Sequence, residues 1–125
     1  ENGMKVDFFG CARSGHNQIS CLTKIVSTTN DQTIIANRNH PFLIAGLIGS
    51  SLFDNLGREY AAEVSAFDQT SSKGLEISLI QGVPVEVKFI FNDIDIQAIA
   101  ISAFKPVFVN KSDQSIQGNF RNISF

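Results

Sequence analysis

The sequence lacks tryptophan and has a single tyrosine, Tyr60, although phenylalanine occurs 11 times. A phenylalanine ring has no polar atom and can be buried without a hydrogen-bond partner. The composition therefore predicts a core filled by phenylalanine rings. An apolar content of 43% and a charged content of 18% are typical of a globular protein and argue against a disordered chain.

Long apolar runs and clusters of positive charge are also missing. The most apolar stretch, PFLIAGLIGSSLF, is interrupted by glycines and serines and is too short for a membrane-spanning helix, so we expect no membrane insertion. The ten basic residues are scattered and the formal net charge is −2, which argues against nucleic acid or an anionic membrane as the partner. The first residues, ENGMKV, lack a basic region followed by an apolar one, so we expect no signal peptide within the sequence.

Alternation of apolar and other residues predicts two strands in the middle of the chain. In VPVEVKFIF the apolar positions of one phase are Val83, Val85, Val87, Phe89 and Phe91. In LEISLI they are Leu75, Ile77 and Leu79. The intervening QGVP is typical of a turn, so we expect the two strands to be antiparallel neighbours.

The stretch FNDIDIQAIAISAF, residues 91–104, places two aspartates inside an apolar segment. Its second part, IQAIAISAF, has apolar residues in both phases, which favours a central strand covered on both faces, although its period also fits a short buried helix. Asn92, Asp93 and Asp95 precede that strand. We interpret them as turn residues whose side-chain oxygens bind backbone groups.

Two further pairs of apolar runs flank residues that favour turns. SGHN lies between MKVDFFGCAR and NQISCLTKIVSTT and predicts an N-terminal hairpin. Asp54, Asn55 and Gly57 lie within LFDNLGREYAAEV and predict a second hairpin. The alternative for this second region is a helix over residues 41–56, which its glycines and serines weaken.

The spacing of these elements predicts the fold class. Short strands with turn signals at regular intervals extend to a last alternating strand around Phe120, Ile123 and Phe125. We therefore expect an all-β chain, an immunoglobulin-like antiparallel β-sandwich of seven to nine strands, with residues 1–125 as one domain.

The two cysteines lie almost symmetrically about the expected N-terminal turn, in CARSGHNQISC. Cys11 and Cys21 would then face each other across the hairpin, within the Cα separation that a disulfide requires. We predict that they form a disulfide. The alternative is a pair of buried free thiols in a reducing compartment.

The sequence does not indicate a catalytic site, and we expect no enzymatic activity. Nucleophilic catalysis needs a nucleophile, a base and an orienting acid at compatible positions. GLIGSS does not match a nucleophile elbow or a phosphate-binding loop. We interpret His16 as an exposed turn residue and His40 as a loop residue.

We also expect no metal and no cofactor. Zinc would need four ligands, or three and a water molecule, and only the two histidines are available to join the cysteines. Calcium takes six to eight oxygens. The candidate groups supply about half of these: Asp54, Asn55 and Asp68, or Asn92, Asp93 and Asp95.

Several segments together resemble a known family. LFDNLGREY, LEISLIQGVPVEVKFIF and IAISAF are similar to small exported immunoglobulin-like domains of bacteria, of unknown function, which are grouped with a secreted mycobacterial immunogenic protein. The pattern C-x-R-S-G…C and the ending FRNISF resemble a subset with a paired-cysteine hairpin. The resemblance does not cover residues 33–48. The matching positions are Cys11, Arg13, Ser14, Gly15, Cys21, Asp54, Gly57, Tyr60, Gly82, Pro84, Phe89, Phe91, Phe120, Arg121 and Asn122.

These observations lead to two functional hypotheses. The first is a non-enzymatic module, periplasmic, cell-surface or secreted, that binds another protein or a neighbouring domain or is a structural part of a larger bacterial assembly. The alternative is a domain that binds a sugar, a lipid or a metal ion; the sequence singles out no residues for such a ligand. An exposed apolar patch or bare sheet edge would favour a protein partner, whereas a deep pocket with converging polar groups would favour a small ligand.

Overall fold

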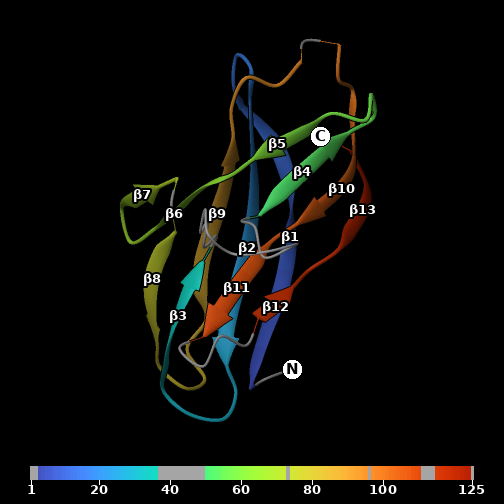
Figure 1. Cartoon of the computed structure of the whole chain (residues 1–125). Coiled ribbons are helices and arrows are strands. Elements are labelled where there is room, and N and C mark those ends of the chain that lie inside the picture. The colour runs from blue at the N-terminus through green and yellow to red at the C-terminus, as the bar shows by residue number, and fades with distance from the viewer. Residues whose placement is uncertain (1–2, 37–49, 73, 96, 111–114, 125) are drawn as a thin grey trace, which may run out of the picture.

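The computed structural model describes residues 3–36, 50–72, 74–95, 97–110 and 115–124 (Figure 1). Within these residues the chain forms 13 strands and no helix. The strands are β1 (Met4–Gly15), β2 (Gln18–Ser27), β3 (Gln32–Ala36), β4 (Ser51–Asp54), β5 (Glu59–Ala61), β6 (Glu63–Ala66), β7 (Gln69–Ser71), β8 (Leu75–Leu79), β9 (Val85–Phe91), β10 (Ala100–Lys105), β11 (Val107–Asn110), β12 (Ser115–Gln117) and β13 (Phe120–Ser124).

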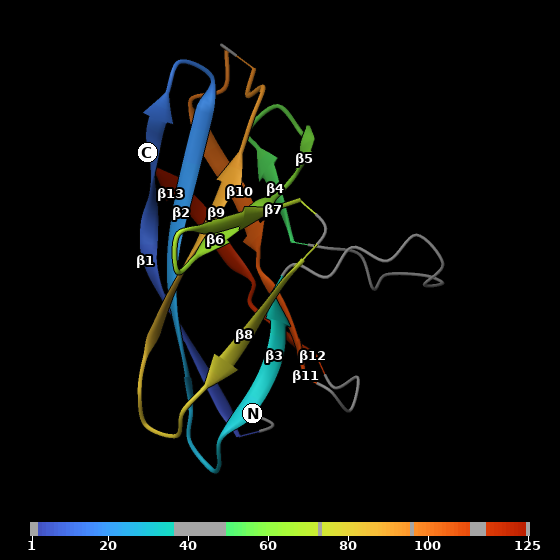
Figure 2. The ribbon, with the colours of Figure 1, turned by 90° about the vertical axis from the view of Figure 1, so that its left-hand side faces the viewer.

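The strands pack as a sandwich. One layer is a five-stranded sheet with the order β1-β2-β9-β6-β7. The facing layer contains two four-stranded sheets, with the orders β13-β10-β4-β5 and β12-β11-β3-β8 (Figure 2). All strand pairs are antiparallel. The prediction of an all-β antiparallel sandwich is confirmed.

The expected number of seven to nine strands is wrong, because the second layer bends and its long strands break. Only Pro106 separates β10 from β11, which belong to different sheets. Proline has no N–H to donate, so the ladder is interrupted there. Opposite this break, the Gly118 N–H donates to the Pro106 carbonyl at 3.0 Å. A Cβ at Gly118 would lie 2.6 Å from the Phe120 ring and 2.9 Å from Pro106 Cγ, so a larger residue would have to displace these side chains.

Buried Ser50 accepts two backbone hydrogen bonds at this bend. Its Oγ accepts a hydrogen bond from the Val107 N–H at 2.8 Å, and its carbonyl accepts one from the Ala62 N–H at 3.3 Å. Ala62 is the single residue between β5 and β6, which belong to different layers. The backbone groups released where the chain changes sheet are therefore satisfied.

Phenylalanine rings fill the core, as the composition predicts. Phe89, Phe91, Phe104 and Phe108 are fully buried. The Phe89 ring meets the rings of Phe104 and Phe108 edge-on, with centroids 5.5 and 5.7 Å apart. Such pairs contribute roughly 0.5–1.5 kcal/mol each beyond the buried area. Four of the predicted inward positions of β9 are confirmed: Val85, Val87, Phe89 and Phe91. Val83 lies outside the strand and is 48% exposed.

The expected pairing of β8 with β9 is wrong. β8 pairs with β3, whereas β9 pairs with β2 and β6 in the opposite layer. The QGVP turn therefore carries the chain from one layer to the other. Alternation shows only that a strand has one buried face. Two strands that are neighbours in one sheet have this property, and so do two strands that face each other across the core.

The third predicted strand is central, between β13 and β4, but it begins at Ala100 rather than at residue 96. Ile99 precedes it and is 75% exposed, and Ser102 on one of its faces is also exposed, so only part of the expected burial on both faces is found. The helical alternative for this stretch is wrong for residues 97–104, and residue 96 lies outside the described residues.

Both expected hairpins are present. β1 and β2 are joined at His16 and Asn17, and β4 and β5 pair across residues 55–58. The alternative helix over residues 41–56 is wrong for β4, and residues 41–49 lie outside the described residues. The last strand is present as β13; Phe125 lies outside the described residues.

Candidate functional site

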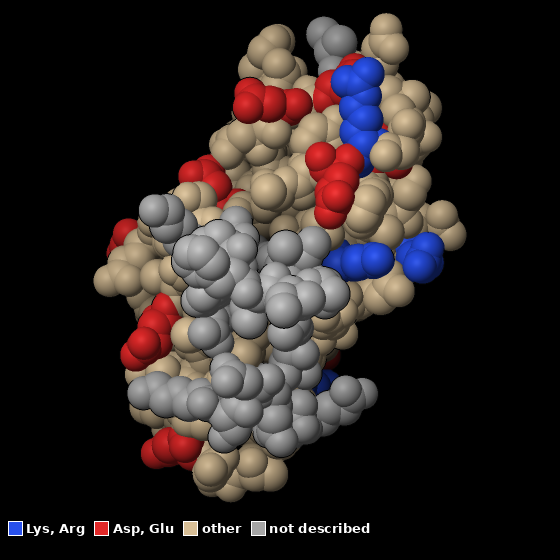
Figure 3. All heavy atoms as spheres, in the orientation of Figure 1, with Lys and Arg blue, Asp and Glu red and all other residues tan. Residues whose placement is uncertain are grey.

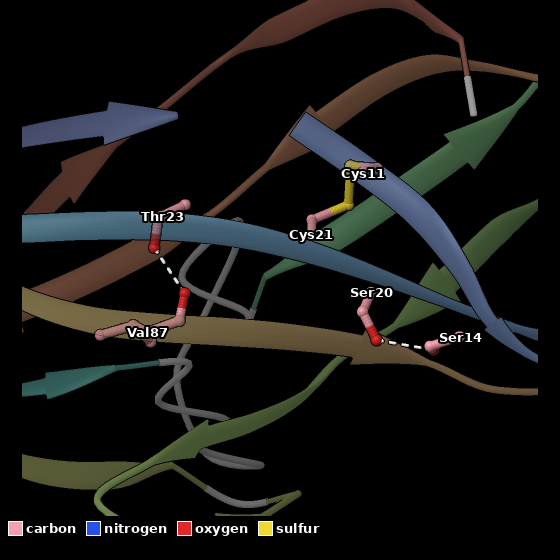
Figure 4. The surroundings of a disulfide bond; sticks show 6 residues. All are labelled: Cys11, Ser14, Ser20, Cys21, Thr23 and Val87. Atoms are coloured by element: carbon pink, nitrogen blue, oxygen red, sulfur yellow. Dashed lines mark hydrogen bonds between the residues drawn. A yellow bond between two sulfur atoms is a disulfide. The ribbon is translucent and has the colours of Figure 1, made fainter. Parts of the chain in front are cut away.

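The predicted disulfide is present, and the alternative of two free thiols is wrong. Cys11 of β1 is directly opposite Cys21 of β2, and their sulfur atoms are bonded (Figure 4). Cys21 is fully buried in the core, and Cys11 is half-buried. The bond ties the edge strand β1 to β2, so its position indicates a structural role.

The interpretation that the side-chain oxygens of Asn92, Asp93 and Asp95 bind backbone groups is confirmed for Asp95 alone, whereas Asn92 binds other side chains. Asp95 Oδ1 accepts a hydrogen bond from the Gln97 N–H at 2.8 Å. Asn92 follows β9 and links the two strands that flank β9: its Oδ1 accepts from Gln18 Nε2 of β2, and its Nδ2 donates to Glu63 Oε1 of β6. Sequence reasoning missed one contact, the ion pair between Asp95 and Arg58 of the β4–β5 turn.

Asp54 anchors the second hairpin. Its Oδ1 accepts hydrogen bonds from the backbone N–H groups of Leu56 and Arg58, and its Oδ2 accepts one from the Tyr60 hydroxyl at 2.8 Å. Burial raises the pKa of Asp54, but these hydrogen bonds more than offset it and leave the pKa below its ordinary value. Burial also raises the pKa of Tyr60, and its bond to the Asp54 carboxylate acts in the same direction.

The candidate metal ligands do not form a metal site in the described part of the chain. Asp54 lies in the β4–β5 hairpin, whereas Asp68 lies in the β6–β7 turn of the other layer. Asn55 Oδ1 accepts a hydrogen bond from the Ile99 N–H at 2.9 Å. Among the described residues no group of three histidine, cysteine or acidic side chains is placed to hold a metal ion. His16 is an exposed turn residue, and His40 lies outside the described residues.

The candidate site is a groove of about 570 Å³. The strands β6, β7 and β8, which contribute to its lining, are seen in Figure 2. The β6–β7 hairpin, β8 and the loop leading into β9 surround it. Its lining includes Phe67, Ile80, Val83, Val85, Glu86 and Lys88. Phe67, Ile80 and Val83 are 66%, 62% and 48% exposed. The groove is therefore bordered by large apolar side chains that the fold leaves in contact with solvent.

Phe67 has a strained backbone and an exposed aromatic side chain. It and Asp68 form the turn between Ala66 and Gln69, and their φ angles are 52° and 62°. Two-residue hairpin turns of this kind favour asparagine, aspartate and glycine, because a left-handed backbone costs a bulky residue about 1–2 kcal/mol. The strained backbone holds an aromatic ring outward, at the edge of the groove. Strain of this kind is typical of functional positions.

The backbone of β9 is only partly covered beside this groove. β6 pairs with β9 through Glu63, Val64 and Ser65, which lie opposite Ile90, Phe89 and Lys88. The pairing ends there, although β9 continues to Val85. In the described part of the chain, residues 85–87 are paired with β2 alone. An unpaired strand edge is a template for another strand.

The described charged residues that line the groove are two acids and one base, Asp68, Glu86 and Lys88. Asp68 and Glu86 line the groove, and neither forms an ion pair with another described residue. In Figure 3, acidic side chains lie along the left margin, on the side of β7 and β8, whereas the visible basic side chains lie toward the opposite side.

No family model matches the chain, and no curated protein matches its sequence. In the part of the chain that the structure describes, no helix has the length and apolar character needed to cross a membrane.

Proposed function

We propose that this chain is a non-enzymatic, extracytoplasmic interaction module that binds a partner protein at the groove beside β9. The observation that carries the proposal is the set of exposed apolar side chains at this groove, Phe67, Ile80 and Val83. An exposed apolar patch beside a bare strand edge favours a protein partner over a small ligand.

Two further observations support this proposal. The Cys11–Cys21 disulfide fits an oxidising compartment, because such bonds persist in the periplasm, at cell surfaces and in secreted proteins. Two acids of the candidate calcium groups, Asp54 and Asp95, are engaged in turns and in contacts with Tyr60 and Arg58. An exported bacterial domain with an immunoglobulin-like fold would have both properties.

The proposal is tested by photo-crosslinking of the full chain in the cells that produce it. A photoreactive phenylalanine analogue is placed at position 67 and, as a control, at position 9, where the native Phe9 is also exposed at 56%. We expect a discrete crosslinked protein from position 67 and none of the same mass from position 9.

An Ile80→Ser exchange in the position 67 variant should abolish this crosslink, because it removes an apolar side chain from the groove without touching the photoreactive group. Crosslinking that is equal at both positions, or that Ile80→Ser leaves unchanged, would show that the partner does not use the groove. No crosslink at position 67 would contradict the proposed function.

A further inference from the structure

We infer that the groove accepts a short extended segment of the partner, which pairs as a strand with residues 85–87 of β9 and has the pattern apolar–basic–apolar. This inference rests on the proposed function and specifies how the partner is recognised. It follows from the backbone edge, from the alternation of β9 and from the charges beside it.

The backbone provides the first part of the inference. The ladder between β6 and β9 ends at the Ser65–Lys88 pair; β6 runs one residue further, to Ala66, and the chain then turns away at Phe67 and Asp68. The groove lies where β6 would otherwise continue, with Val85 and Glu86 in its lining. A strand added there would extend the line of β6 and supply partners for backbone groups of β9.

The side chains of β9 determine which residues such a strand would carry. Val85 and Val87 point into the sandwich, whereas Glu86 points outward. Residues of the added strand opposite the two valines would face the interior and should be apolar. The residue opposite Glu86 would lie on the outer face, where a lysine or arginine forms a favourable cross-strand pair.

Glu86 is available for such a pair. In β2, the residue opposite Glu86 is Lys24, but the Lys24 ammonium lies over the Phe9 ring, 5.1 Å from the centroid. No ion pair joins Glu86 to a described residue. Asp68 adds a second unpaired carboxylate at the groove, and among the described residues of its lining Lys88 is the one basic side chain. This charge balance favours a basic segment.

A second copy of this chain is the rival occupant. Its edge strand β1 begins with Met4, Lys5 and Val6, which has the same pattern. In that case the protein would self-associate as its concentration rises, and a Lys5→Glu exchange would reverse the association. We favour a separate extended segment, because the hairpin tip at Phe67 borders the groove and leaves more room for a single strand than for a whole domain.

The test is a selection of random heptapeptides displayed on phage against the full chain. We expect enriched peptides to contain an apolar residue, lysine or arginine, and another apolar residue in succession. Against the Glu86→Lys variant, the central position should change to aspartate or glutamate. Glu59→Lys, an equal charge change at an exposed position of β5, is the control and should leave the selected pattern unchanged.

Binding of one enriched synthetic peptide is then measured by fluorescence anisotropy. Glu86→Lys should weaken binding about fivefold or more, because it replaces attraction by repulsion. Methylation of the peptide backbone nitrogens, one at a time, should weaken binding about tenfold at alternate positions, because only every second N–H of a strand faces its neighbour.

The outcomes separate this inference from the proposed function. Enriched peptides without the pattern, uniform tolerance of N-methylation, or a selection unaffected by Glu86→Lys would overturn strand addition. If the Ile80-dependent crosslink at position 67 persisted in that case, the groove would still be a protein-binding site. Self-association reversed by Lys5→Glu would also overturn the inference, by identifying a second copy as the occupant.

Discussion

The Tyr60 hydroxyl donates a hydrogen bond of 2.8 Å to Asp54 Oδ2, and the two side chains hold the β4–β5 hairpin together. Asp54 is almost completely buried, with 1% exposure. Its charge is therefore tolerated only because three donors surround it, the Tyr60 hydroxyl and the N–H groups of Leu56 and Arg58. This relationship makes the stability of the chain depend on pH.

We expect the free energy of unfolding to fall as the pH is lowered through the acidic range. The folded-state pKa of Asp54 is below its ordinary value of 3.8, so its stabilising contribution is present above that value and is lost as the pH falls through the folded pKa. Urea denaturation from neutral to strongly acidic pH measures this loss. Asp54→Asn should be less stable at neutral pH and should lose less stability on acidification. The exposed Asp93→Asn is the control, and an equal acid response in both variants would contradict the prediction.

The disulfide should be complete in protein isolated without reductant. Its intact mass should be lower than that of the reduced chain by the mass of two thiol hydrogens, and no thiol should react after denaturation. The double change Cys11→Ala and Cys21→Ala should lower the free energy of unfolding by roughly 2–3 kcal/mol, because the bond closes a short loop in the unfolded chain. Two labelled cysteines in the unreduced protein would contradict this prediction.

Phe89→Ala should destabilise the chain by about 3–5 kcal/mol, the usual cost of removing a buried ring. Phe89 is fully buried and contacts the rings of Phe104 and Phe108 from the opposite layer. Phe9→Ala is the matched control, since Phe9 is 56% exposed, and it should change stability by about 0.5 kcal/mol or less. Chemical denaturation of both variants measures the difference in the free energy of unfolding. Equal losses of stability in Phe89→Ala and Phe9→Ala would contradict the prediction.

Phe67→Gly should stabilise the isolated chain by about 1 kcal/mol and weaken partner binding. Glycine adopts the positive φ of this turn without strain, and the exchange also removes an exposed aromatic ring. Ser65→Gly, in the extended strand before the turn, is the control and should be destabilising. Thermal melting of both variants measures this contrast. A loss of stability in Phe67→Gly would mean that the ring contributes to the fold rather than to binding.

Local geometry explains which features were predictable. The two-residue period of a strand places Phe89 and Phe91 on one face, and nothing distant is needed to infer that this face is buried. The turn at residues 16 and 17 brings β1 and β2 together, and a bulge between Arg13 and Gly15 then shifts the register by one residue, so that Cys11 faces Cys21. Turn residues such as Asp54 likewise bind backbone groups within a few positions of themselves.

Contacts between distant parts of the chain explain the errors. Arg58 reaches Asp95 only because β4 and β10 are neighbours in one sheet, and no spacing in the sequence reports this. The break at Pro106 becomes a change of sheet because Gly118 and Ser50 satisfy the backbone around it. Phe67 could be recognised as a residue of an apolar type, but its exposure depends on where β6 leaves β9.

The sequence by itself determined the all-β class, the two hairpins and the disulfide, because strand period and turn chemistry act over a few residues. The tertiary structure alone decided which strands became neighbours, since one buried face satisfies a strand equally well in either layer. It also decided the groove, where the exposed side chains of Phe67, Ile80 and Val83 meet the uncovered edge of β9. The exposure of a side chain depends on the packing of all the strands around it, so it cannot be read from the residues next to it in the sequence.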